Sequence, residues 1–187
     1  DGTYAIGATV SISATTSEAI QSGNTLTVSL DSGATVTLTA ASAGTTLTGT
    51  YTVASGNSSS DLTVSSFTIG TVLDTAGNAM SSTTVPSGSS NIGGAKAIVI
   101  DGVVPTMTVS ASPTSVSSGG TSTITFTASE ATTTFALADI SSTLGTLSNF
   151  QSSSSTSYTA TFTAAQSVGG TAVVTVASGS FSDANGN

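Results

Sequence analysis

Alternation of apolar and small polar residues runs through most of this chain and constrains its fold more than any other feature. In residues 9–14 (TVSISA), every second side chain is Val, Ile or Ala, and Thr or Ser stands between them. A period of two turns one face of an extended strand toward a core and the other toward solvent. Thr, Val and Ile are branched at Cβ, which favours strand over helix. No useful helical period is present, so the sequence predicts an all-β protein.

Short strands of this kind recur in both halves of the sequence. In the first half they are predicted at residues 9–14, 26–30, 36–39, 47–53, 62–64, 67–73 and 97–100. In the second half they are predicted at residues 107–111, 123–128, 135–140, 158–163 and 172–176. About seven short strands in about 100 residues are typical of an immunoglobulin-like (Ig-like) β-sandwich.

A junction separates the two halves. The apolar run 97–100 (AIVI) ends at Asp101, Gly102 follows, and Pro105 cannot extend a ladder because it lacks a backbone N–H. The chain also begins with Asp1-Gly2, so the Asp-Gly pair is interpreted as a domain entrance that occurs twice. We predict two tandem Ig-like sandwiches, residues 1–101 and residues 102–187.

The two predicted domains end differently. The first has the strand 97–100 after the loop 74–78 (DTAGN), whereas the matching loop 183–187 (DANGN) ends the second. The second sandwich is therefore predicted to lack its closing strand. We expect that strand to come from sequence outside this segment or from a neighbouring molecule, because an open sheet edge promotes strand addition. Asp1 is likewise interpreted as a mature or excised terminus, with any targeting sequence lying before it.

Charge and residue types exclude several classes of function. The 187 residues include nine acids and Lys96 as the only base, giving a formal net charge of −8. Nucleic acids and anionic membrane surfaces attract clustered Lys and Arg, which this chain lacks. No apolar run approaches the roughly 20 residues of a membrane-spanning helix. His and Cys are absent, which excludes disulfides, imidazole or thiolate catalysis and the usual zinc sites.

Most acids fall in turns and junctions, and three classes recur in both halves. They are an entrance aspartate, an acid after the second strand, and an Asp-x-x-Gly-Asn loop. In a sandwich the first strand leaves one pole, the second returns to it, and the loop before the closing strand lies there too. We therefore expect one cluster beside the linker and one at the outer end of the first domain. The first would contain Asp101, Glu130, Asp183 and Asn187, and the second Asp1, Glu18, Asp74 and Asn78.

These oxygen-rich clusters have two interpretations. Two carboxylates ~4 Å apart repel by about 4 kcal/mol at an effective dielectric near 20. Ca²⁺ takes six to eight oxygen ligands in flexible geometry, so it would relieve this repulsion and stiffen the linker. Alternatively, Asp and Asn occupy these loops because they stabilise turns. The spacing is not that of an EF-hand loop.

Three short motifs carry a resemblance to a known family. They are Ser-Glu-Ala after an alternating strand, Asp-x-x-Gly-Asn near the domain end, and Ile-Asp-Gly-x-x-Pro at the junction. Together they resemble the bacterial Ig-like, cadherin-like repeats of surface-layer (S-layer) proteins and of large calcium-dependent surface adhesins. The resemblance covers both halves, and it implies tandem sandwiches, calcium at linkers and an extracellular place at the cell surface. This chain is poorer in Asp than the adhesin repeats.

No catalytic constellation accompanies these motifs. The acids lie on loops with few aromatic side chains to line a sugar cleft, and Ser has no His to activate it. We therefore expect a structural protein and not an enzyme. One hypothesis is an S-layer or filament subunit that assembles with copies of itself, because low charge lets identical surfaces pack. The alternative is a spacer module of a large secreted adhesin, which the tandem repetition favours. Flanking Ig-like domains and cell-surface glycans are the other expected partners.

Overall fold

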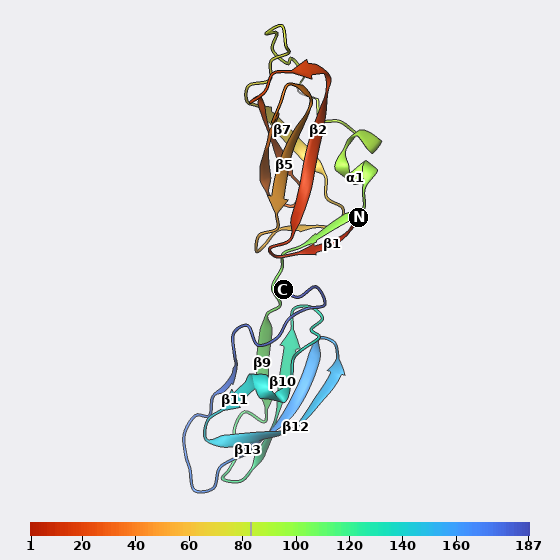
Figure 1. Ribbon diagram of the computed structural model, residues 1–187. Coiled ribbons are helices and arrows are strands. Elements are labelled where there is room, and N and C mark those ends of the chain that lie inside the picture. Colours follow the sequence, from red (N-terminus) through yellow and green to blue (C-terminus); the bar gives the residue numbers. More distant parts are fainter. Residues whose placement is uncertain (83) are drawn as a thin grey trace. The chain divides into compact units, whose positions relative to one another are not determined.

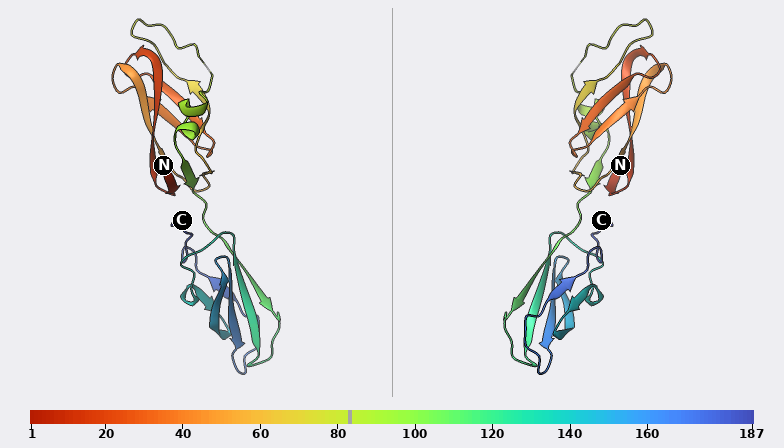
Figure 2. Two further views of the ribbon diagram at one scale, coloured as in Figure 1. Left: turned by 90° about the vertical axis from the view of Figure 1, so that its right-hand side faces the viewer. Right: turned by 90° about the vertical axis from the view of Figure 1, so that its left-hand side faces the viewer.

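The computed structural model describes residues 1–82 and 84–187 (Figures 1 and 2). The chain forms two compact units, Asp1–Val103 and Val104–Asn187. Each unit has its own hydrophobic core, and each is described by itself. The boundary between the units falls inside the junction that the sequence predicts, two residues after Asp101.

The described part of the first unit holds eight strands in two sheets (Figure 1). The larger sheet has the order β2-β5-β4-β3-β7 and the smaller has the order β1-β8-β6. The strands of the larger sheet are β2 (Thr9–Ile20), β3 (Thr25–Leu30), β4 (Thr35–Thr39), β5 (Gly44–Thr52) and β7 (Val64–Ile69). Those of the smaller sheet are β1 (Gly2–Ala5), β6 (Ser58–Ser59) and β8 (Ile98–Asp101), and two short helical turns, η1 (Gly88–Ser90) and α1 (Ile92–Ala95), precede β8.

The alternating pattern produces the core of the first unit. In β2, Val10 and Ile12 are buried while Ser11 and Ser13 are exposed. The same alternation in the other strands yields one apolar cluster between the two sheets, in which Leu38, Leu47 and Leu62 are fully buried. Burying one such side chain stabilises the fold by about 1.5–3 kcal/mol.

The first and last strands of this unit, β1 and β8, pair in parallel. Gly2 lies opposite Ile98 and Ala5 opposite Asp101. Alternation does not predict β1, because its four residues have no two-residue period. The Asp1-Gly2 pair therefore leads into a strand, and it does not form a second copy of the junction at Asp101-Gly102.

The second unit also has two sheets in its described residues. A four-stranded sheet has the order β12-β13-β10-β9, and β11 pairs with β14. The strands are β9 (Met107–Ser112), β10 (Thr121–Ala128), β11 (Ile140–Ser142), β12 (Gly145–Ser154), β13 (Ser157–Ala164) and β14 (Val174–Val176), with the turn η2 (Leu137–Asp139) before β11.

This order is that of an Ig sandwich. An Ig sandwich has its first, second, fifth and fourth strands in one sheet and its third, sixth and seventh in the other. Here β9, β10, β13 and β12 fill the first set, and β11 and β14 are the third and sixth strands. No seventh strand pairs with β14 among the described residues. The all-β, Ig-like fold is thus confirmed, with the closing strand absent from this unit.

Aromatic packing holds the core of the second unit. The ring of Phe135 meets four other rings edge to face, with centroid distances from 5.0 to 5.6 Å: Phe126, Phe150, Tyr158 and Phe181. Such pairs contribute about 0.5–1.5 kcal/mol each beyond their buried area. Phe135 therefore connects β10, β12, β13 and the C-terminal loop.

The predicted strands 62–64 and 135–140 differ from the observed ones. Leu62 is fully buried but lies before β7, which begins at Val64. Half of residues 135–140 forms the turn η2 (Leu137–Asp139), where Oδ2 of Asp139 accepts a hydrogen bond of 2.8 Å from the backbone N–H of Ala136. Strand β12 was not predicted, since its apolar residues are sparse and Asn149 interrupts it with φ 51°.

Candidate metal centres

The loop Asp74–Asn78 is a turn that the side chain of Asp74 holds together. Oδ1 of Asp74 accepts hydrogen bonds from the backbone N–H groups of Ala76 (2.8 Å) and Asn78 (2.7 Å). Oδ2 accepts one from the side-chain amide of Asn78 (2.7 Å). Gly77 has φ 95°, a conformation that glycine adopts without steric cost. The residues Asp, Gly and Asn of the motif each supply one element of this turn.

The loop Asp183–Asn187 repeats this geometry in the second unit. Oδ1 of Asp183 accepts from the backbone N–H groups of Asn185 (2.8 Å) and Asn187 (3.0 Å), and Oδ2 accepts from the side-chain amide of Asn187 (3.0 Å). Gly186 has φ 89°. Asp74 forms a β-bridge with Ile20, and Asp183 forms one with Thr132. The two Asp-x-x-Gly-Asn motifs are therefore one structural element used twice.

These hydrogen bonds favour the ionised carboxylates. The pKa of Asp74 lies below 3.8, chiefly because the side-chain amide of Asn78 donates to it, and also because backbone N–H groups do. For Asp183, burial is the largest single influence and raises the pKa. The donors of Asn187, Asn185 and Gly186 together outweigh burial, so the pKa of Asp183 is lowered as well. Both turns carry a negative charge at neutral pH.

The same contacts limit what either loop offers a metal ion. An ionised carboxylate has about four acceptor positions. At least three are used inside each turn, so at most about one remains on the carboxylate of Asp74 or Asp183. The turn interpretation is therefore sufficient to explain the Asp-x-x-Gly-Asn motif, and a cation here would need further ligands from elsewhere.

Three of the four residues expected at the outer end of the first domain lie near one another. Asp74 and Asn78 are hydrogen-bonded, and Glu18 lies near the end of β2, whose Ile20 bridges to Asp74. Glu18 is exposed, and its backbone carbonyl accepts a hydrogen bond of 2.8 Å from the hydroxyl of Thr16.

Asp1 lies elsewhere in the first unit, which corrects the expected convergence. Oδ1 of Asp1 accepts a hydrogen bond of 2.9 Å from the backbone N–H of Ala97, where β1 begins beside β8. In Figure 1 the N-terminus lies beside these strands, and β2 runs away to the opposite end of the unit. Within residues 1–82 and 84–103, no three carboxylates form a group that could share one ion.

The other predicted cluster draws on both units. Inside the second unit, Glu130 follows β10 and Asp183 pairs with Thr132, so the two acids come together. One carboxylate oxygen of Glu130 lies within 4.8 Å of one carboxylate oxygen of Asp183. Asp183 is buried and Glu130 is half-buried. This pair and Asn187 are the part of the predicted site that a single unit contains.

Asp101 belongs to the first unit. It ends β8, is half-buried, and its Oδ1 accepts a hydrogen bond of 3.2 Å from the backbone N–H of Val103. Gly102, which follows it, packs against the turn at 54–57: a Cβ at this position would lie 2.3 Å from the carbonyl oxygen of Ala54. The participation of Asp101 in a site with Glu130 and Asp183 stays a prediction.

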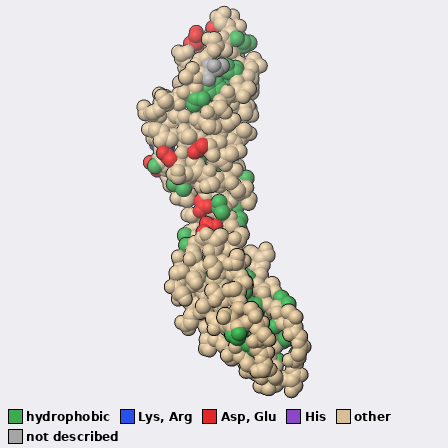
Figure 3. All heavy atoms as spheres, turned by 180° about the vertical axis from the view of Figure 1, so that it is seen from behind, with side chains coloured by type: hydrophobic (Ala, Val, Ile, Leu, Met, Phe, Trp, Pro, Cys, Tyr) green, Lys and Arg blue, Asp and Glu red, His purple; other side chains and the backbone are tan. Residues whose placement is uncertain are grey.

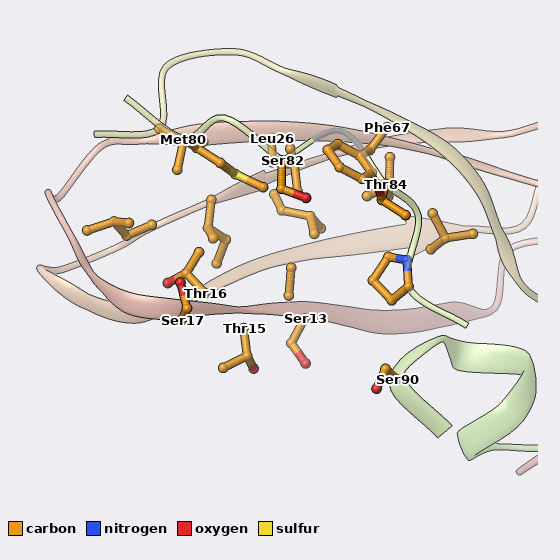
Figure 4. A pocket seen from close by; sticks show the side chains of 18 of the residues that line it. Ser13, Thr15, Thr16, Ser17, Leu26, Phe67, Met80, Ser82, Thr84 and Ser90 are labelled. Carbon is orange, nitrogen blue, oxygen red and sulfur yellow. The ribbon is translucent and has the colours of Figure 1, made fainter. Parts of the chain in front are cut away.

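A cavity in the first unit was not anticipated from the sequence. It has a volume of about 730 Å³ and lies between β2 and a wall that includes residues 80–82 and 89–92. Figure 4 shows Met80, Ser82 and Thr84 on one side, together with Leu26 and Phe67, and Thr16 of β2 on the other. Ser13 and Thr15 point away from the cavity. Alternation predicts which side chains face a core, but it cannot predict where a cavity lies beside that core.

A comparison of the sequence with known protein families agrees with the strand order of the second unit. Residues 101–187 match the family described as a bacterial Ig-like domain. The matched range begins at Asp101, which ends β8 in the first unit, and it includes Glu130 after β10 and the Asp183 turn in the second unit. No curated protein and no solved structure matches the chain. No helix in the described residues is long and apolar enough to cross a membrane.

Proposed function

We propose that this chain is a structural module of a bacterial surface protein, and specifically a self-assembling S-layer or filament subunit outside the cell. The observation that carries the proposal is a pair of β-sandwich units, one matching bacterial Ig-like domains, with almost no surface charge. Charged residues make up 5% of the chain, against about 25% in ordinary soluble domains. On the face in Figure 3, acids are a few scattered groups on an otherwise uncharged surface.

Low charge favours contact between identical copies. Like charges on two copies repel over roughly the Debye length of about 8–10 Å, and this chain has few charges to repel. The abundant Ser and Thr hydroxyls keep the surface polar without adding charge. Copies of the same chain are therefore the proposed partners, with cell-surface glycans as a second class, and no catalytic role is proposed.

Calcium is the proposed cofactor of the linker. Asp101, Glu130 and Asp183 would hold it, with Asn187 as a further source of oxygen. In support, Glu130 and Asp183 have oxygens within 4.8 Å, and Asp183 is held ionised. At an effective dielectric near 20, two such charges repel by roughly 3–4 kcal/mol. When bound, Ca²⁺ would neutralise this repulsion and tie the carboxylates together. We do not extend the proposal to Asp1.

A second candidate is a spacer module of a large secreted adhesin. The tandem arrangement of two sandwich units favours it, because spacers are built by repeating one domain along a chain. Its partners would be flanking Ig-like domains instead of laterally packed copies.

Electron microscopy of the purified chain separates the two candidates. Samples at equal protein concentration are imaged with Ca²⁺ and with EDTA. Sheets or fibres that require Ca²⁺ support the self-assembling subunit. Single dispersed particles in both conditions, with a monomer mass in light scattering, contradict it and support the spacer.

A further inference from the structure

We propose that the outer edge of β2 in the first unit binds an extended strand in the way that β10 binds β9 in the second unit. The occupant is an uncharged, alternating segment of the β9 type, supplied by an Ig-like repeat. The inference stands independently of self-assembly, because it concerns one sheet edge and one kind of segment.

The two units can be aligned by their shared motif. Ser17-Glu18-Ala19 lies at the end of β2, and Ser129-Glu130-Ala131 follows β10, so equivalent residues differ by 112 in number. Each of the two strands pairs on one side with an antiparallel strand. Strand β2 pairs with β5, and β10 pairs with β13, the strand equivalent to β5. Strands β2 and β10 are therefore equivalent.

Their other sides differ. Strand β10 pairs with β9 from Thr123 opposite Ser112 to Ala128 opposite Met107. Strand β2 is the last strand of its sheet, and none of the strands in residues 1–82 and 84–103 pairs with its outer edge. Subtracting 112 places the equivalent of the β9-binding edge at residues 11–16.

The cavity of the first unit lies along this same stretch. Residues 12–18 of β2 form one wall, and the opposite wall includes Met80, Ser82 and Thr84 (Figure 4). The lining also includes the core residues Leu26 and Phe67. A strand paired with residues 11–16 would lie about 4.8 Å from β2, and side chains of its inward face would enter this cavity, whose lining is part apolar and part hydroxyl-bearing. The cavity of the first unit thus lies at the position where the second unit has β9.

The β2 edge lacks the usual protection against strand addition. Edge strands of soluble proteins are blunted by Lys, Pro, short length or inward-pointing charge. Residues 9–17 contain no charged residue and no Pro, and β2 is 12 residues long. An edge of this kind is a template for a strand whose sequence suits it, and MTVSAS of β9 shows what suits the equivalent edge.

The test is a fusion that supplies the strand at the aligned position. Residue number 113 aligns with Asp1, so a second copy of residues 105–112 (PTMTVSAS) is placed directly before Asp1 in the full chain. The matched control carries Pro at the copies of Val109 and Ser110. Two adjacent prolines remove at least one ladder donor whichever phase the strand adopts.

Amide hydrogen exchange read by mass spectrometry gives the result. We expect exchange in residues 11–16 to be at least tenfold slower in the fusion than in the proline control and in the parent chain. Equal exchange in fusion and control overturns the proposal, as does slowing confined to β14. A labelled PTMTVSAS peptide added to the parent chain should slow the same amides, and light scattering distinguishes this from dimer formation. Slowing that a small apolar ligand reproduces, but the peptide does not, also overturns it.

Discussion

The side-chain amide of Asn78 donates a hydrogen bond of 2.7 Å to Oδ2 of Asp74. The last residue of the Asp-x-x-Gly-Asn motif thereby binds the first, and Asn187 and Asp183 repeat this contact at 3.0 Å. Each turn contains its own donors, so its charge is stabilised inside one short segment. The motif is consequently a self-sufficient fold element, and any role in binding cations is additional to it.

The contact between Asn78 and Asp74 predicts a pH dependence. The pKa of Asp74 is lowered in the folded chain. The stability that its ionised carboxylate contributes is therefore present above pH 3.8 and is lost as the pH falls through the folded pKa. Asn78→Ala should move the pKa of Asp74 up toward 3.8, as read by NMR of the carboxyl carbon. At pH 6, the first unit of Asn78→Ala should melt at a lower temperature than that of the parent. At a pH low enough to protonate Asp74, the two melting temperatures should be equal.

Thr75→Ala is the control for this change, because Thr75 lies in the same turn and its backbone N–H, which the substitution keeps, donates to the carbonyl of Ala19. An Asp74 pKa that is the same in Asn78→Ala as in the parent would contradict the assignment.

Gly186→Ala should destabilise the second unit by about 1–2 kcal/mol. A Cβ at this position meets no atom within 4 Å, so the cost arises from the backbone, whose φ of 89° disfavours residues with a Cβ. Gly169→Ala is the matched control, since its surroundings are equally open and its φ is not positive. Thermal or urea unfolding measures both variants, and equal effects would show that the turn tolerates Ala.

Phe135→Ala should destabilise the second unit by about 3–5 kcal/mol, the usual cost of removing a buried aromatic ring. The ring contacts four others, and the cores of the two units contain different residues. Hydrogen exchange should therefore accelerate in β10 and β13 and stay unchanged in β3 and β4. Val173→Ala serves as control because that side chain is 53% exposed. A uniform acceleration across both units would argue against independent cores.

Glu130→Gln should reduce stabilisation by calcium. An ion at 100 times its Kd stabilises a folded protein by about 2.7 kcal/mol, and Glu130→Gln removes one of the proposed charged ligands. Calorimetry with Ca²⁺ and with EDTA measures the difference in melting temperature. Glu18→Gln, which removes an exposed charge from β2, is the comparison. If EDTA leaves the melting temperature of the parent chain unchanged, the calcium proposal is wrong.

Local patterns predicted most of the fold because they depend on neighbours in sequence. Alternation located β2 and β10, and the Asp-x-x-Gly-Asn motif located both turns. Long-range relations were harder. Asp1 was grouped with Asp101 by its Asp-Gly pair, although Glu18 follows Asp1 by 17 residues and Glu130 follows Asp101 by 29. That mismatch in spacing signals that the two aspartates occupy different places. The four ring contacts of Phe135 and the cavity beside β2 depend on three-dimensional packing. A periodic pattern in the sequence does not predict such packing.

The parallel pairing of β1 and β8 bears on how the first unit resists mechanical load. If a cell-surface chain is pulled at its two ends, Gly2 and Asp101 are drawn apart along the direction of the strands. In this geometry the ladder between β1 and β8 is loaded in shear, so its hydrogen bonds must break together and not one after another. Forced unfolding depends on the rate of crossing the unfolding barrier. We therefore expect this short pair of terminal strands, four residues each, to limit how much tension the first unit withstands.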